Sequence, residues 1–119
     1  MVETMLEEMQ DYYQILAGRH RLILLSLDDQ QLYCTFFVLY SPGQLEDYYR
    51  KPCWDTPTDE ADGPIVYLDK LLAPYMNRSV WETIHAQLTQ RVPSWVVAVW
   101  YRYCPRQDRD VRHTFRRRR

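Results

Sequence analysis

The amino-acid sequence predicts an α/β domain built on a mixed sheet of four to five strands flanked by two main helices. Three observations lead to this fold class. Apolar residues recur at spacings of three and four over residues 2–17 and again over 80–91, which is typical of helices that bury one face. Several runs are rich in β-branched and aromatic residues, as strands are. The second helix separates two such runs, 65–70 and 94–102, and this order predicts a right-handed unit with parallel strands.

The chain of 119 residues, 46% of them apolar, is long enough for one hydrophobic core and too short for two. We expect a single domain over residues 1–105. Residues 106–119 are rich in arginine, and we expect either a last short edge strand with a basic end or, as the favoured alternative, a mobile tail. From residue 102 to the end there are eight arginines against two aspartates, a net +6, so the other 101 residues carry −7.

Composition argues against several classes of protein. There are three glycines and no glycine-rich phosphate loop. No stretch approaches the roughly 20 apolar residues of a membrane span, and the N-terminus is acidic and amphipathic. Cys34, Cys53 and Cys104 are odd in number and widely spaced, which favours free thiols over a disulfide framework or a zinc site. We therefore expect a cytoplasmic protein with no membrane contact, no metal and no cofactor.

The first three elements follow from local patterns. Gly18 is a typical residue for the end of the first helix. Two apolar, β-rich runs come next, residues 21–27 and 31–40, and the polar residues 28–30 between them have turn chemistry. Together these runs predict a β-hairpin.

The segment of residues 41–63 is the least regular part of the chain. It contains three prolines, two glycines and an excess of acidic side chains. Residues 44–50 have the spacing of a helical turn or two, and the remainder reads as a long loop. Such a loop is either functional or, alternatively, a solvated acidic insertion that Trp54 anchors to the body.

Residues 63–81 predict a strand, a sharp corner and the start of a helix in close succession. Asp69 is the one carboxylate within the strand. Ser79 and Glu82 have the S-x-x-E form of a capping box, which predicts that the helix begins at Val80. A carboxylate on an apolar strand beside a helix start is a candidate site, and the alternative is a structural ion pair with a neighbouring basic side chain.

This order of elements resembles the core of the GNAT acyltransferase fold, in which the parallel strands open a V-shaped cleft for the acyl donor. Within that fold the sequence resembles the RTX toxin-activating lysine acyltransferases over roughly residues 18 to 115. Residues 66–75, VYLDKLLAPY, resemble their WFIDWIAPF motif, and residues 90–93, QRVP, resemble the close of their next helix. Residues 33–36, YCTF, stand in place of a YCSW-like stretch.

The resemblance implies a catalytic pair, because in that family a histidine near the N-terminus acts together with the motif aspartate. Asp69 matches the aspartate, whereas His20, His85 and His113 do not correspond to the histidine. The resemblance therefore implies a degenerate active site.

The resemblance also implies acyl carrier protein as the donor, with a single phosphate to be bound. Ser79, Val80 and Trp81, at the expected helix start, are the candidates for contacting it. A capping box would use two of the amides there and Glu82 would add a negative charge, which argues against coenzyme A.

Two functions of different classes remain open. The first is a binding or assembly module, such as a virion component or an inhibitor encoded by a mobile element, in which the fold is kept and the chemistry is lost. The second is an active protein-lysine N-acyltransferase that uses acyl carrier protein. The partner in the first case is a protein or a second copy, because the arginines could meet an acidic segment such as residues 46–62 of a neighbour. Nucleic acid is disfavoured, because the net −7 of the body repels phosphates.

Overall fold

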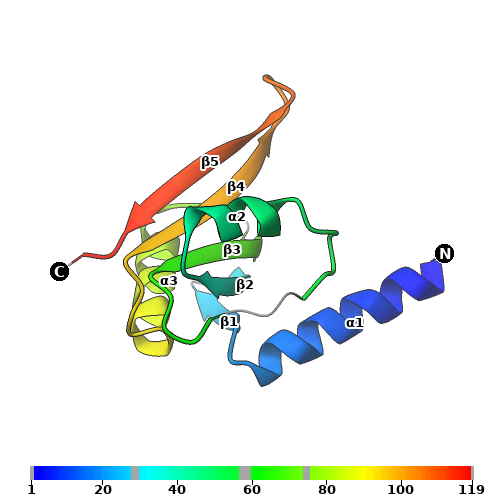
Figure 1. Ribbon diagram of the computed structural model, residues 1–119, viewed down its shortest axis with the longest axis horizontal. Helices are drawn as coiled ribbons and strands as arrows, with labels where there is room; N and C mark the ends of the chain where they lie inside the picture. Colours follow the sequence, from blue (N-terminus) through cyan, green and yellow to red (C-terminus); the bar gives the residue numbers. More distant parts are fainter. Residues whose placement is uncertain (1, 28–29, 57–59, 74–75, 119) are drawn as a thin grey trace.

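The computed structural model describes residues 2–27, 30–56, 60–73 and 76–118 (Figure 1). Within them the chain forms three helices and five strands, which confirms the predicted α/β fold with a GNAT-like mixed sheet. None of the described helices combines the length and the apolar character needed to cross a membrane. In chain order the elements are α1 (Val2–Gly18), β1 (Leu22–Leu27), β2 (Gln30–Leu39), α2 (Pro42–Tyr49), β3 (Ile65–Leu72), α3 (Arg78–Arg91), β4 (Val97–Cys104) and β5 (Arg109–Arg116).

The strands form one sheet in the order β1-β2-β3-β4-β5. Neighbouring strands are antiparallel except β3 and β4, which are parallel and joined by α3. The predicted hairpin is β1 with β2, where Ile23 lies opposite Cys34. Its turn at residues 28–29 lies outside the described residues. The predicted parallel pair is confirmed, with Ile65 opposite Val97.

Helices cover both faces of the sheet, because the central strands are apolar on both faces. On one face α3 contributes Val80, Ile84 and Leu88 to a core that also contains Val66 and Leu68. On the other face α1 and α2 cover a second core; in Figure 1 α2 lies in front of the sheet. That core contains Tyr12, Leu16, Phe37, Leu39, Leu45, Ile65, Tyr67 and Val99. Successive residues of β3 thus alternate between two buried layers, as the two-residue period of a strand requires.

The C-terminal segment is ordered as an edge strand, so the favoured expectation of a mobile tail is wrong for residues 109–116. These residues form β5 and pair with β4 along its whole length. Inward side chains, namely Val111, His113 and Phe115, alternate with exposed ones. The ring of Phe115 packs on Trp81 with centroids 3.9 Å apart. Three half-buried side chains at a period of two are enough to hold a strand that is otherwise arginine-rich.

Helix α3 begins two residues before the predicted start, and the predicted capping box is wrong. The N-cap is Asn77, whose side-chain oxygen accepts a hydrogen bond from the backbone N–H of Val80 at 3.0 Å. Ser79 lies exposed in the first turn. Glu82 forms an ion pair with Arg78 instead, with Nε and Oε1 3.0 Å apart. Asparagine and serine are comparable N-cap residues, so the sequence pattern alone did not distinguish the two positions.

Trp54 anchors the loop between α2 and β3 to the body of the protein, as one of the two interpretations of this loop predicted. A capping box at Ser41 and Gln44 starts α2, which confirms the predicted helical turns. Beyond α2, Trp54 returns to the body, where its ring lies 5.5 Å from that of Tyr12 and 6.1 Å from that of Tyr13. The loop is therefore fastened to α1 by an aromatic cluster.

The revised N-cap gives a paired test by mutation. Asn77→Ala removes the side-chain acceptor of the Val80 amide and should lower the free energy of unfolding by about 1 kcal/mol. Ser79→Ala, two residues away, should change it by less than about 0.5 kcal/mol, because the Ser79 side chain is exposed inside the helix. Urea denaturation followed by circular dichroism measures both. A larger loss for Ser79→Ala than for Asn77→Ala would restore the capping box.

Candidate functional site

Asp69 lies where the hydrogen-bonded ladders on both sides of β3 are interrupted. Towards β2, Lys70 is opposite Thr35 and Leu68 is opposite Phe36, so Asp69 is an extra residue, a β-bulge. Towards β4, the parallel pairing ends at Leu68, opposite Trp100. Beyond this point the β4–β5 hairpin extends away from β3 (Figure 1). The sheet thus splits immediately after Leu68, and Asp69 is the first residue of β3 in the split.

The bulge brings two neighbouring side chains to the same side of the strand. Adjacent residues of a regular strand point to opposite faces, but two bulge residues that share one partner need not. Here the Nζ of Lys70 lies 3.5 Å from Oδ2 of Asp69. Lys70 also lies over the rings of Tyr12 and Trp54, 5.6 and 5.2 Å from their centroids. The predicted structural ion pair of Asp69 is therefore present, and it forms with Lys70.

A hydroxyl from α1 completes the surroundings of the aspartate. The Tyr12 phenol donates a hydrogen bond to Oδ2 of Asp69 at 2.6 Å. The same phenol oxygen lies 2.5 Å from Oγ1 of Thr35 on β2. Oγ1 of Thr35 in turn accepts the backbone N–H of Lys70 at 3.1 Å. Three elements far apart in the sequence, α1, β2 and β3, are joined by this network, whose four members are Tyr12, Thr35, Asp69 and Lys70.

Burial dominates the protonation behaviour of this network. The Asp69 side chain is only 15% exposed. Its burial raises the pKa of the carboxyl group, while the hydrogen bond from Tyr12 and the charge of Lys70 act in the opposite direction. Burial, and then the adjacent Asp69 carboxylate, raise the pKa of Tyr12 well above its usual value. The phenol therefore keeps its proton at neutral pH and acts as a hydrogen-bond donor.

Two cavities open beside Asp69. The larger, about 400 Å³, occupies the split of the sheet, with residues 69–72 of β3 on one side, residues 100–103 of β4 on the other, and Trp54 beside them. The smaller, about 180 Å³, lies under α2 and is polar, with Lys51, Asp55 and Asp110 among its lining residues. Asp69 and Lys70 line both cavities. The carboxylate thus lies at a junction between two hollows on the α1 and α2 face of the sheet.

The other residues predicted for the site lie elsewhere. Val80 is buried in the core beneath α3, and its amide is already bonded to the side chain of Asn77. Trp81 packs on Phe115, and Ser79 is exposed. These three residues belong to the α3 face, whereas the Asp69 network belongs to the opposite face. The structure does not bring them together with the aspartate.

Sequence reasoning missed two members of the network. Tyr12 is one of several apolar residues on the buried face of α1, and nothing nearby in the sequence marks it as a partner of Asp69. Thr35 is a buried hydroxyl-bearing side chain that lies between the apolar residues Cys34 and Phe36. That isolated hydroxyl was a usable signal, because a buried polar group needs a hydrogen-bond partner.

Two of the histidines have neighbours other than Asp69: Nε2 of His85 accepts the backbone N–H of Arg118 at 3.0 Å, and His113 stacks on Trp100 with ring centroids 5.1 Å apart. Throughout residues 2–27, 30–56, 60–73 and 76–118, no three His, Cys, Asp or Glu side chains are grouped as metal ligands would be.

The raised pKa of Asp69 predicts a pH-dependent contribution to stability. Because its pKa is higher in the folded protein than in the unfolded chain, the folded protein binds more protons between the two values. Asp69 therefore contributes stability below its unfolded pKa of about 4, and this contribution is lost as the pH rises through the folded pKa. The free energy of unfolding of the wild-type protein, relative to Asp69→Asn, should rise as the pH is lowered from neutral to about 4. Urea denaturation at each pH measures it.

A second pair of variants provides the control. Tyr12→Phe removes the hydrogen bond that favours the ionised carboxylate, so the same pH dependence should extend to higher pH. Tyr13→Phe, the neighbouring residue, removes no bond to Asp69 and should leave the profile unchanged. A difference between wild type and Asp69→Asn that does not vary with pH would contradict the assigned shift.

Comparison with known proteins leaves the description at the level of the fold. The sequence matches no protein-family model, and a search of curated proteins finds no match to it.

Proposed function

We propose that this protein is a non-catalytic binding or assembly module with a GNAT-like fold, in which the cleft of an acyltransferase is retained and its proton-transfer chemistry is lost. One observation carries the proposal. The group that reaches Asp69 from α1 is the phenol of Tyr12, whereas the resembling enzymes pair the motif aspartate with a histidine.

The chemistry of the pair supports this proposal. Acyl transfer to an amine needs a base that can take a proton near neutral pH, which an imidazole does well. The pKa of Tyr12 is raised far above neutrality, so its oxygen does not act as that base. Oδ2 of Asp69 is already engaged twice, by the phenol and by the ammonium group of Lys70. A carboxylate held in this way supports the packing of α1 on the sheet.

The charge distribution supports an acidic protein surface as the partner. The edge strand β5 exposes Arg109, Arg112 and Arg116. The described acidic side chains of residues 46–62 include several that are exposed, namely Glu46, Asp47, Asp55 and Asp62. A second copy of the chain therefore carries a surface complementary to β5. Contacts between such surfaces weaken with added salt, because the exposed charges are screened within about 8 Å at physiological ionic strength.

The three cysteines are consistent with a cytoplasmic location for this module. Cys34, Cys53 and Cys104 are all free thiols. Burial raises the pKa of Cys34 to about 12, so that side chain stays a protonated thiol within the core.

A specific observation also favours the second candidate, a protein-lysine N-acyltransferase that uses acyl carrier protein. Asp69 has a raised pKa and borders a cavity of about 400 Å³ in the split of the sheet. In this candidate, Asp69 itself would act as the base, without a histidine partner.

Acyl transfer distinguishes the two candidates. The protein is incubated with acyl carrier protein that carries a fatty acyl chain and with a lysine-rich acceptor peptide. It should transfer no acyl group to the peptide faster than the uncatalysed reaction does. The reason is that neither Tyr12 nor the engaged Asp69 carboxylate provides an effective base. Mass spectrometry of the acceptor measures transfer. Turnover that Asp69→Asn abolishes would reject the binding-module proposal in favour of the enzyme.

Charge-driven association tests the proposed partner surface. By multi-angle light scattering, the mass of the protein should exceed that of a monomer at low salt and fall towards it as salt is added. Arg109→Gln with Arg112→Gln should abolish the increase, because both side chains are exposed on β5. Arg19→Gln with Arg78→Gln changes the net charge equally, outside both β5 and residues 46–62, and should preserve it. A wild-type mass that stays monomeric in low and high salt counts against self-association.

A further inference from the structure

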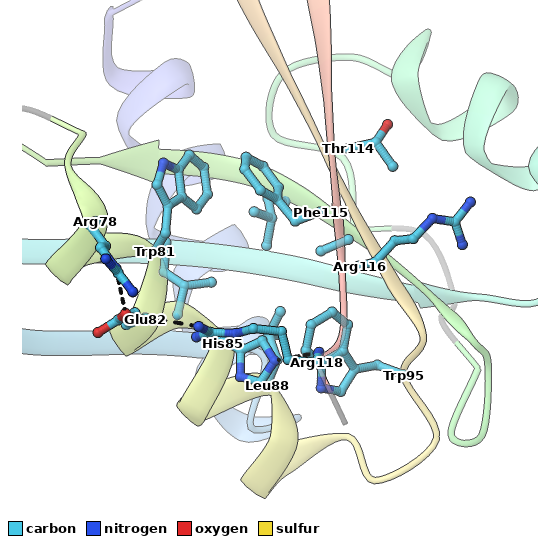
Figure 2. A pocket seen from close by; sticks show the side chains of 13 residues that line it. Arg78, Trp81, Glu82, His85, Leu88, Trp95, Thr114, Phe115, Arg116 and Arg118 are labelled. Carbon is cyan, nitrogen blue, oxygen red and sulfur yellow. Dashed lines mark hydrogen bonds and ion pairs between the residues drawn. The ribbon is translucent and has the colours of Figure 1, made fainter.

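A second, larger cavity lies on the face of the sheet opposite Asp69. It has a volume of about 510 Å³ and lies between α3 and the strands β4 and β5 (Figure 2). Leu68 and Ala98 belong to its floor, and Ile84 and Leu88 contribute from α3. These four side chains are part of the core on the α3 face. The volume is within the range of roughly 300–1,000 Å³ that is usual for small-molecule sites.

Aromatic side chains form the walls of this cavity. Trp81 from α3 and Phe115 from β5 pack against each other at one end, with ring centroids 3.9 Å apart. Trp95, at the start of the segment leading into β4, lies at the other end (Figure 2). His85 makes an edge-to-face contact with Trp95 at 5.1 Å. Aromatic side chains from α3, from β5 and from the segment before β4 therefore make the interior of the cavity apolar.

The rim of the cavity is positively charged. Arg78, Arg116 and Arg118 line it, together with one carboxylate, Glu82. Glu82 is already paired with Arg78, and Nη1 of Arg118 lies 3.9 Å from its Oε1. The guanidinium groups of Arg78 and Arg118 outnumber this carboxylate by one, while that of Arg116 points away from the cavity (Figure 2). The rim therefore attracts an anion.

Backbone hydrogen bonds hold Arg117 and Arg118, the last described residues, at this rim. The backbone N–H of Arg118 donates to Nε2 of His85 at 3.0 Å, and that of Arg117 donates to the carbonyl of Val96 at 2.8 Å. Burial and the nearby Arg118 and Arg117 lower the pKa of His85, so its ring is neutral and accepts that bond. These backbone hydrogen bonds, together with the ion pair to Glu82, therefore keep the Arg118 side chain beside the cavity.

We propose that this cavity binds a small amphiphilic anion, an apolar chain or ring that carries a single carboxylate or phosphate head group. The apolar part would lie between α3 and the floor formed by Leu68 and Ala98. The head group would be held by Arg78 and Arg118, which form charge-assisted hydrogen bonds with such anions. Charge complementarity at the rim and apolar lining inside select this class over a neutral lipid or a cation. The site is separate from the Asp69 network, and it does not depend on whether that network is catalytic.

The test uses three probes with the intact protein. Dodecanoate, kept below its critical micelle concentration, is expected to bind saturably by isothermal titration calorimetry and to alter the tryptophan fluorescence, because Trp81 and Trp95 line the cavity. Dodecyl phosphate distinguishes the two head groups. Dodecyltrimethylammonium has the same chain with a positive charge and should bind at least tenfold more weakly. Equal binding of the anionic and cationic probes overturns the proposal, as does a failure of both anions to bind.

Variants locate the binding to the rim. Arg78→Gln with Arg118→Gln should weaken dodecanoate binding tenfold or more, the usual consequence of losing charge-assisted hydrogen bonds. Both side chains are largely exposed, 88% and 62%, so the fold should tolerate the change. Arg50→Gln with Arg106→Gln removes the same charge from positions that do not line the cavity, and should leave the affinity within twofold of wild type. Equal weakening by the two double variants would show a non-specific charge effect and refute the site.

Discussion

The rest of the structure depends on where the parallel pairing of β3 with β4 ends. This pairing consists of only four residue pairs, from Ile65 and Val97 to Leu68 and Trp100. Up to the last of these four pairs, the sheet is continuous and its central strands are buried on both faces. After it β3 stays with β2, and β4 stays with β5, so the two halves separate. The bulge at Asp69 falls at this boundary. A cleft bordered by Asp69 and Lys70 is thereby formed in a sheet whose central strands are otherwise apolar.

The division of the molecule into two faces separates two kinds of site. On the α1 face, a partly buried carboxylate lies beside a phenol, a hydroxyl and an ammonium group, and its Oδ2 is bound by two of them. On the α3 face, a larger cavity keeps an apolar interior and an arginine rim. The central strands lie between them, since Leu68 contributes to one face and Tyr67 to the other. A ligand on one side therefore need not disturb the other.

The fold could be predicted from the sequence more completely than the site. Periodicity placed both main helices and four strands, because each buries side chains at the spacing of its own secondary structure. The start of α3 was misplaced, since Asn77 and Ser79 are equivalent as local signals. β5 is hard to recognise as a strand because four of its eight residues, Arg109, Asp110, Arg112 and Arg116, are charged. The pairing of Tyr12 with Asp69 spans 57 residues and follows from how α1 packs, while an extra bulge residue leaves no local pattern.

The two edges of the sheet differ in their exposure to unwanted assembly. A free edge offers unpaired backbone groups to any other strand, and charged residues discourage such pairing. On β5 the arginines supply that protection. The other edge, β1, has the sequence LILLSL with no charge at all. There, Arg91 at the end of α3 donates from Nη1 to the carbonyl oxygen of Leu22 at 2.8 Å. Arg91, at the end of α3, thus also occupies a backbone acceptor on the free edge of β1. Partly unfolded chains in which α3 has detached would expose β1 as a template for aggregation.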